Sequence, residues 1–350
     1  MTGGVIRPGE PWFDTDGHRI QAHGGSVLAQ DGFFYWYGEN KEHTAPGSGI
    51  WHWGIRCYRS TDLCTWEDLG LIIPPVEDDP DSPLHPAQMV DRPHIVRDPR
   101  TGRYVAWLKI MHRDGRQLST VLVADALCGP YEIVATDVRP NGMYAGDFDL
   151  VVDPVDGKGY HYYGRPHSEL VCADLSDDFT ATTGYYSTHF PGKQPPEARE
   201  APAYFRRGRT HYLVTSGTSG YFPNRSQIAS ADTYHGPWTV LGDPHPGDPT
   251  GTSFRSQVTS VFRHPGKRDL YIALADRWLP HRCAEQSDQT DVFRRLVAGE
   301  PLDDVVTAEL RQDFFTADTR VADYVWLPIR FDGSIPTIEW RDEWRIDEFD

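Results

Sequence analysis

Five times along this chain, a polar side chain that could take part in catalysis stands directly before an apolar strand pattern. The five positions are His23 in QAHGGSVL, Asp91 in DRPHIV, Asp147 in GDFDLVV, Glu200 in EAPAYF and Gln257 in SQVTSVF. They recur at intervals of roughly 50–70 residues, a spacing that suggests a repeat architecture such as a propeller. If each position opens an equivalent repeat around a ring, the five side chains converge on one central pocket.

Each repeat has the same order of elements. An apolar strand leads through a tight turn into an aromatic strand, and a longer loop then precedes a third strand and an aromatic edge strand. Asp31-Gly32, Arg207-Gly208 and Pro265-Gly266 supply the turn chemistry that joins antiparallel strands. Each repeat is therefore expected to be a four-stranded antiparallel sheet with two apolar faces.

We predict an all-β chain that forms a single five-bladed β-propeller over residues 1–350, with its blades around a central active-site pocket. A radial stack buries both faces of each sheet and closes the ring. The blades are expected at approximately 20–80, 90–140, 147–190, 200–245 and 257–345, the fifth interrupted by a polar insertion from about 281 to 321. A β-sandwich is the alternative, and five copies rather than two halves favour the propeller.

The composition argues against several classes of partner. A formal charge of −17 leaves no basic surface for nucleic acid, and no apolar run is long enough to cross a membrane. The five cysteines lack the spacing of zinc ligands or of a disulfide framework. We expect a monomer without a metal site. The first residues, MTGGVIRPGEPWFD, lack a signal-peptide pattern, which predicts a cytoplasmic location; secretion is the alternative if a signal was removed.

Three of the five recurring residues are carboxylates, and hydrolysis of a glycosidic bond needs a protonated carboxyl group and an activated water. Like charges near Glu200 would raise its pKa and keep it protonated, while an arginine such as Arg92 would keep a neighbouring carboxylate ionised. Asp147 is the partner that the pattern indicates for Glu200. A lone Asp or Glu before a strand is more often a turn or edge cap, but three in phase favour a shared site.

Longer motifs extend this pattern over almost the whole chain. They are DTDGHRIQAHGG with FYWYGENK, DRPHIVRDPRTGRYVAW, GDFDLVVD, REAPAYF with YLVTSGTSGY, GPWTVLGDP, SFRSQVTSVF, ALADRW and YVWLPIRFDGSIPTIEW. With these motifs the chain resembles family 43 of the glycoside hydrolases, which are five-bladed propellers, and within it the branch of exo-β-1,3-galactanases. The resemblance implies an inverting mechanism, in which water attacks the anomeric carbon in a single displacement.

The resemblance also implies roles for individual residues. Glu200 matches the general acid of the family, and Asp147 matches the aspartate that tunes the pKa of that acid. Most of the family has an aspartate base before the first blade, where this chain has QAHGG with His23. Gln257 matches the glutamine with which the galactanase branch holds the attacking water. Asp91 stands where that branch commonly has glutamate; it is a candidate base or substrate contact, and its shorter side chain would alter the fit of the substrate.

Six residues are predicted to bind the substrate. They are Glu39, His23, Arg92, Thr218, Tyr221 and Trp278. Glu39 would hydrogen-bond sugar hydroxyls or form a salt bridge at a blade edge, and Arg92 would clamp Asp91 or the substrate. Tyr221 and Trp278 would stack on sugar rings or fill the interfaces between blades.

The resulting prediction is an inverting, exo-acting glycosidase that releases galactose from β-1,3-galactan or a related plant-type oligosaccharide. An α-L-arabinofuranosidase, β-xylosidase or galactofuranosidase would keep the chemistry and change the sugar. The missing base leaves a carbohydrate-binding propeller without catalysis as an alternative from another class. No cofactor is expected to be required. A calcium ion on the propeller axis, which some family members hold, is not expected in this chain.

Overall fold

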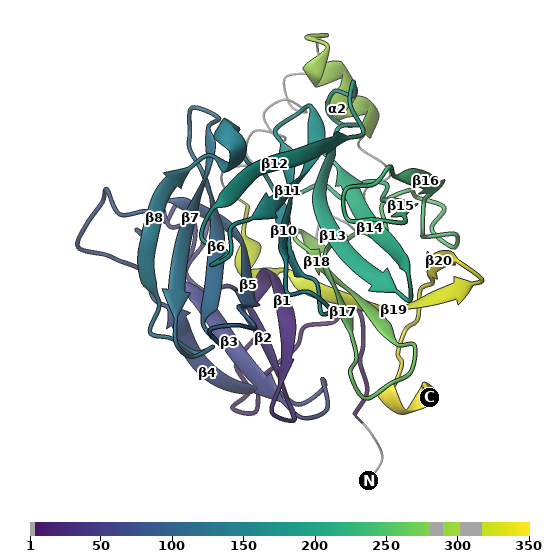
Figure 1. Cartoon of the computed structure of the whole chain (residues 1–350), viewed down its shortest axis with the longest axis horizontal. Helices are drawn as coiled ribbons and strands as arrows, with labels where there is room; N and C mark the ends of the chain where they lie inside the picture. The colour runs from purple at the N-terminus through teal and green to yellow at the C-terminus, as the bar shows by residue number, and fades with distance from the viewer. Residues whose placement is uncertain (1–3, 281–289, 302–316) are drawn as a thin grey trace.

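The computed structural model describes residues 4–280, 290–301 and 317–350, and within them the strands form five four-stranded sheets around a central axis (Figure 1). Each sheet is made of four strands that are consecutive in sequence, and neighbouring strands are antiparallel. The predicted five-bladed propeller is confirmed.

The blades follow one another along the chain. The first contains β1 (His23–Gln30), β2 (Phe33–Glu39), β3 (Ile55–Ser60) and β4 (Glu67–Ile73). The second contains β5 (Met89–Arg97), β6 (Tyr104–Met111), β7 (Gln117–Ala124) and β8 (Glu132–Val138). The third contains β9 (Phe148–Val152), β10 (Gly159–Arg165), β11 (Glu169–Leu175) and β12 (Thr182–His189). The fourth contains β13 (Arg199–Arg207), β14 (Thr210–Gly217), β15 (Gln227–Ala231) and β16 (Thr239–Gly242). The fifth contains β17 (Gln257–Arg263), β18 (Tyr271–Arg277), β19 (Asp323–Asp332) and β20 (Ile335–Ile338).

In the part of the chain that the structure describes, helical structure is confined to short segments. The described part of the insertion between β18 and β19 contains helix α2 (Thr290–Val297), while residues 281–289 and 302–316 lie outside the described residues. The 3-10 turns η1, η2 and η3 are Pro140–Gly142, Thr319–Val321 and Ile346–Glu348. No helix in the described ranges is long and apolar enough to cross a membrane.

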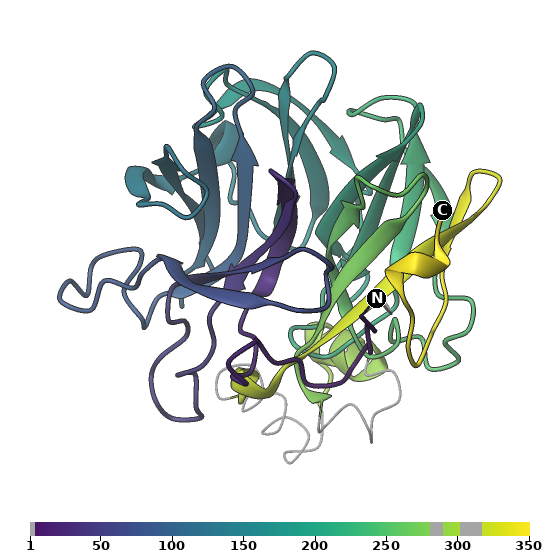
Figure 2. The same cartoon turned by 90° about the horizontal axis from the view of Figure 1, so that it is seen from below.

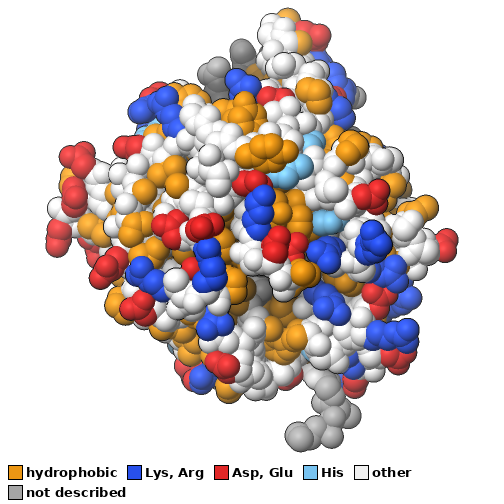
Figure 3. Space-filling model, viewed as in Figure 1, with side chains coloured by type: hydrophobic (Ala, Val, Ile, Leu, Met, Phe, Trp, Pro, Cys, Tyr) orange, Lys and Arg blue, Asp and Glu red, His pale blue; other side chains and the backbone are white. Residues whose placement is uncertain are grey.

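The core lies between the blades, because the inner strands carry apolar side chains on both faces of each sheet. Between blades 5 and 1, the rings of Trp36, Trp66 and Trp326 pack edge to face with centroid distances of 4.6–6.0 Å. Between blades 3 and 4, Tyr162 stacks on Tyr204 at 5.2 Å. The outer strands β8 and β12 are mostly exposed, and charged side chains of both signs are interspersed over the face seen in Figure 3.

The first strand of each blade lies innermost. These strands neighbour one another in a closed circle, β1 with β5, β5 with β9, β9 with β13, β13 with β17 and β17 with β1. The ring is joined where the two ends of the chain meet (Figure 2): Ile6 and Trp344 exchange two backbone hydrogen bonds of 2.9 and 3.0 Å. The residues that open the first strands are thereby brought to one end of the axis.

A β-bulge directly follows the opening residue in β1, β5 and β13, and in β17 it lies one residue further on. The register shifts lie after His23, Asp91, Glu200 and Val258. Gly24, Arg92 and Ala201 have positive φ angles of 64°, 52° and 47° at three of these bulges. A bulge bends its strand and redirects the preceding side chain, which is why bulges occur beside active sites.

Candidate active site

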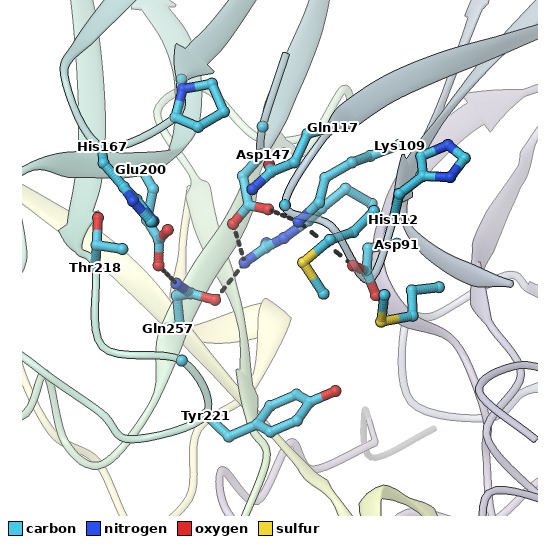
Figure 4. A pocket seen from close by; sticks show the side chains of 18 of the residues that line it. Asp91, Lys109, His112, Gln117, Asp147, His167, Glu200, Thr218, Tyr221 and Gln257 are labelled. Atoms are coloured by element: carbon cyan, nitrogen blue, oxygen red, sulfur yellow. Dashed lines mark hydrogen bonds and ion pairs between the residues drawn. The ribbon is translucent and has the colours of Figure 1, made fainter. Parts of the chain in front are cut away.

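The innermost strands begin around a pocket of about 470 Å³. Nine of the ten residues predicted from the sequence line it: Glu39, Asp91, Arg92, Asp147, Glu200, Thr218, Tyr221, Gln257 and Trp278. Figure 4 shows Asp91, Asp147, Glu200 and Gln257 arranged around this pocket, although they come from blades 2, 3, 4 and 5. The ring geometry therefore gathers residues that are far apart in the sequence.

Asp147 lies between two cations. Lys109 Nζ is 2.7 Å from Asp147 Oδ1, and Arg92 Nη2 is 3.2 Å from Asp147 Oδ2, so each carboxylate oxygen faces one positive charge. Burial alone would raise the pKa of Asp147, but the charges of Arg92 and Lys109 outweigh it and lower the pKa to about 2. Asp147 is therefore a permanent negative charge in the pocket at neutral pH.

Glu200 has the opposite character. Burial raises the pKa of Glu200 to about 8, and the negative charge of Asp147 acts in the same direction. The cations Lys109, Arg92 and Arg199 oppose this shift only in part. Glu200 is therefore protonated at neutral pH. Two neighbouring carboxyl groups whose pKa values are pushed apart form the pattern of a general acid beside an ionised partner.

The amide of Gln257 is held at both ends. Its Oε1 accepts a hydrogen bond from Arg92 Nη2, and its Nε2 donates to Ser216 Oγ at 2.8 Å and lies 3.5 Å from Glu200 Oε1. One of the dashed lines in Figure 4 marks the contact between Glu200 and Gln257. These contacts fix the amide in one orientation, which a group that positions a water molecule requires.

Asp91 is held by Trp51 and Lys109. The indole N–H of Trp51 donates to Asp91 Oδ1 at 2.9 Å, and Lys109 Nζ is 3.4 Å from Asp91 Oδ2. Lys109 sits opposite Asp91 in the register of β5 and β6, and also pairs with Asp147 of the next blade. The side chain of Asp91 is 16% exposed, compared with 10% for Asp147, so a ligand in the pocket can reach it.

Glu39 supports the backbone of the pocket wall. Its Oε1 accepts a hydrogen bond from the backbone N–H of Arg92 at 2.9 Å, and its Oε2 is 2.8 Å from Lys41 Nζ. The Glu39 side chain is 2% exposed, and burial raises its pKa to about 7. Its carboxylate also packs against Gly24, where a Cβ atom would lie 2.4 Å from Glu39 Oε1. Glu39 thus forms the ion pair that was one of its two predicted roles, and its contact with sugar hydroxyls stays a prediction.

Arg92 does not clamp Asp91. Its guanidinium joins Asp147 to Gln257 instead, so that alternative for Arg92 is wrong. The left-handed backbone at Arg92 in the bulge of β5 separates its direction from that of Asp91. A contact between Arg92 and a substrate stays a prediction.

His23 requires a correction, because it lies behind the pocket rather than in its lining. The side chain is fully buried, with Nδ1 3.0 Å from Asp276 Oδ1 and its ring stacked on Tyr324 at 4.9 Å. Burial lowers the pKa of His23, although Asp276 opposes the shift. The imidazole is thus used in the interface between blades 1 and 5. Among the described residues, no three His, Cys, Asp or Glu side chains are grouped to hold a metal ion.

Aromatic rings form one wall of the pocket. The ring of Tyr221 lies 5.5 Å from Trp278 and 6.3 Å from Trp51 between centroids. Trp278 is 8% exposed; it packs against Leu279 and Ala322, and a small part of it faces the pocket. The Thr218 hydroxyl lines the pocket but donates its proton to Ala198 O at 3.0 Å, which leaves it an acceptor for a ligand.

Four supporting residues were not anticipated from the sequence. They are Lys109, Trp51, Ser216 and Asp276. Lys109 had a signal, because a lysine between Leu108 and Ile110 in a buried strand needs a charged partner. Trp51 stands in a loop, where nothing local indicates the direction of its side chain.

Comparison with known proteins agrees with this arrangement. The sequence model described as Glycosyl hydrolases family 43 matches residues 22–291, which is more than half of the chain. Two solved structures described as family 43 β-1,3-galactosidases have TM-scores of 0.79, at 28% and 27% sequence identity. The match to the first structure covers 99% of this chain and 65% of the matched chain. The match to the second, which was solved with galactodeoxynojirimycin, covers 97% of this chain and 100% of the matched chain. This chain thus spans slightly less than two thirds of the first.

A third solved structure is an exo-β-1,3-galactanase from Clostridium thermocellum, with a TM-score of 0.75 and 25% identity over 97% of this chain and 66% of that one. No curated protein sequence matches this chain.

Proposed function

The chain belongs to family 43 of the glycosyl hydrolases, and from that membership we propose that this glycosidase is an inverting, exo-acting β-1,3-galactanase. The observation that carries the proposal is the pair of carboxyl groups with divergent pKa values, about 8 for Glu200 and about 2 for Asp147, in one pocket. The likeness to two β-1,3-galactosidases at 27–28% identity supports galactose as the sugar.

Glu200 acts as the general acid. At neutral pH it carries the proton that the leaving oxygen needs as the glycosidic bond breaks. The negative charge of Asp147, fixed by Arg92 and Lys109, keeps the proton on Glu200 until the transfer. Asp147 thereby tunes the acid and is not itself consumed in the reaction.

Gln257 positions the attacking water and does not take its proton. Arg92 has only hydrogen-bond donors, so the oxygen of Gln257 that faces it must stay an acceptor. A neutral amide is also far too weak a base to take a proton from water. Gln257 therefore stays an amide, whose second lone pair can hold a water molecule.

We assign removal of the proton from water to Asp91. It is the most exposed of the ion-paired carboxylates that line the pocket, at 16% compared with 10% for Asp147 and 2% for Glu39. Lys109 and Trp51 fix its position through one contact to each carboxylate oxygen. Asp91 thus takes the part of the aspartate base that most of the family has before the first blade.

Replacement of the acid tests the assignment. The Glu200→Gln variant should lose about 10²–10⁴-fold in kcat/KM on β-1,3-galactobiose. It should lose far less on a dinitrophenyl β-galactoside, because that leaving group needs no proton. Glu197→Gln is the matched control, since Glu197 lies three residues away, 44% exposed and paired with Arg294. If the parent protein cleaves neither substrate, the galactanase proposal fails.

The stereochemistry and mode of attack are tested separately. NMR of the first-formed product should show α-galactose, which is the inverted anomer; β-galactose as the first product would contradict the single displacement. Digestion of β-1,3-galactotriose should release galactose one unit at a time. Early release of larger fragments from a polymer would contradict the exo mode.

A further inference from the structure

A second hollow opens beside the main pocket. This side pocket has a volume of about 250 Å³ and shares Trp51, Arg113 and Tyr221 with the main pocket. The other residues that line it come from the 44–50 loop, Ala87, Ala317 and Thr319. A molecule bound in the main pocket can therefore extend past the shared residues into a space large enough for one more sugar ring.

Trp51 is a rigid partition between the two spaces. Its backbone N–H donates to Pro86 O at 2.8 Å, and its indole N–H donates to Asp91 at 2.9 Å. Lys41 Nζ lies 5.1 Å from the centre of its ring, and the ring of Tyr221 lies at 6.3 Å. Both ends of the tryptophan are fixed, so its ring is a preformed surface of the kind on which sugars stack.

The remainder of the side pocket is lined by small polar and apolar residues. Gly47, Ser48 and Gly49 contribute little side-chain bulk, and hydroxyl groups are present on Thr44 and Thr319, which bond to each other at 2.9 Å. None of the described lining residues other than Arg113 carries a charge. Aromatic rings, hydroxyl groups and one cation are the components of a site for an acidic sugar.

Arg113 is the cation, and it has no counter-ion among the residues that the structure describes. It is exposed on the turn between β6 and β7, and its guanidinium has no hydrogen bond or ion pair with the described residues. The carboxylate nearest to Arg113 in the sequence is that of Asp114, which forms an ion pair with Arg116 (Nε to Oδ2, 2.7 Å). In a chain with 51 acidic and 34 basic residues, an unpaired arginine at the border of two pockets is available to a ligand.

We infer that the side pocket binds a hexuronate residue attached to the galactosyl chain, with its carboxylate on Arg113 and its ring against Trp51 and Tyr221. One guanidinium matches one planar carboxylate, which it can bind through two parallel hydrogen bonds. A sulfate ester can accept the same pair of hydrogen bonds, so a sulfated ligand is the competing source of negative charge that the experiment must distinguish. This inference rests on the proposed function, because it assumes that a galactosyl residue occupies the main pocket.

Calorimetry on the Glu200→Gln background, which prevents turnover, tests the inference. The ligands are a β-1,3-galacto-oligosaccharide and the same oligosaccharide bearing a glucuronic acid branch. The acidic ligand should bind about five- to tenfold more tightly than the neutral one. The added Arg113→Gln change should abolish this preference, while Arg116→Gln on the same turn should leave it intact. Added NaCl should reduce the preference in the background protein, because the pair is partly exposed to solvent.

Three results would overturn the inference: equal affinity for the two ligands, a preference that survives Arg113→Gln, or tighter binding of a sulfated than of a glucuronate-bearing ligand. Hydrolysis by the parent protein is measured on the same two oligosaccharides. If neither is cleaved, the proposed function fails, and the binding ratio still reports on the side pocket independently.

Discussion

The charge on Asp147 should control the pH at which the enzyme stops working. In the parent protein the basic limb of the pH profile of kcat/KM is expected near pH 8, where Glu200 loses its proton. Asp147→Asn removes the like charge that raises the pKa of Glu200. The positive charges of Arg92 and Lys109, which already lower the pKa of Glu200, remain in place, and Lys109 keeps its contact with Asp91. Loss of the like charge therefore moves the limb toward lower pH.

The size of the shift follows from these contacts. A neighbouring charge in a partly buried site changes a pKa by about one to two units, equivalent to about 1.4–2.7 kcal/mol. The pKa of Glu200 should then fall from about 8 to about 6–7. For a pKa of about 6.5, the protonated fraction at about pH 7 drops from about 90% to about 25%. Activity at neutral pH should therefore fall about fourfold for this reason alone and recover at about pH 5.

The assay is a profile of kcat/KM against pH for the parent protein, Asp147→Asn and a control. Asp177→Asn is suitable as the control. Asp177 is fully exposed on the turn after β11, and its substitution removes the same charge from the surface of the protein. The position of the basic limb is the diagnostic quantity, rather than the height of the plateau. An unchanged or raised limb in Asp147→Asn would refute the proposed coupling between the two carboxyl groups.

Two further outcomes are expected from the same electrostatics. Lys109→Met removes a cation that lowers the pKa of Glu200, so the basic limb should move by about one unit to higher pH; a shift to lower pH would contradict this role. Glu200→Gln should stabilise the fold at about pH 8 and leave its stability nearly unchanged at about pH 4. The pKa of Glu200 is raised from 4.5 to about 8 in the folded protein. Between these two pH values the carboxyl group ionises more readily in the unfolded chain, which favours unfolding of the parent protein. The gain in the free energy of unfolding, measured with urea, should reach up to about 5 kcal/mol, and a variant less stable than the parent at pH 8 would disprove it.

The convergence of Asp91, Asp147, Glu200 and Gln257 on one pocket could be predicted because each precedes an apolar strand at a regular interval. The repeat determines where the strands begin, and the closed ring then brings these beginnings together. No knowledge of side-chain contacts was needed for that step. The sequence pattern does not specify the local direction of the chain at each bulge. For this reason the prediction that the His23 side chain lines the pocket was wrong.

His23 and Lys109 illustrate the two limits. The partner of His23 is Asp276, which follows 253 residues later and reaches it only after blades 5 and 1 meet. Lys109 lies within β6, where the sequence pattern predicts an apolar strand and gives no partner for the lysine. Its pairing with carboxylates of two blades depends on the packing of β5 against β9. Contacts between blades are set by tertiary geometry, which no single repeat encodes.

Each blade consists of four strands that are consecutive in the sequence. The ring is closed by aromatic packing and by the bridge between Ile6 and Trp344, and no blade combines strands from both ends of the chain. The order of blades around the axis is therefore cyclic, without a privileged first member. The chain could be opened at the exposed residues 77–81 of the linker between β4 and β5, away from Pro86 and Ala87, and joined across its present ends without removing a strand from any described sheet. A circular permutant of that kind would keep the same pocket, which makes this propeller a suitable scaffold for exchanging whole blades between relatives of different substrate preference.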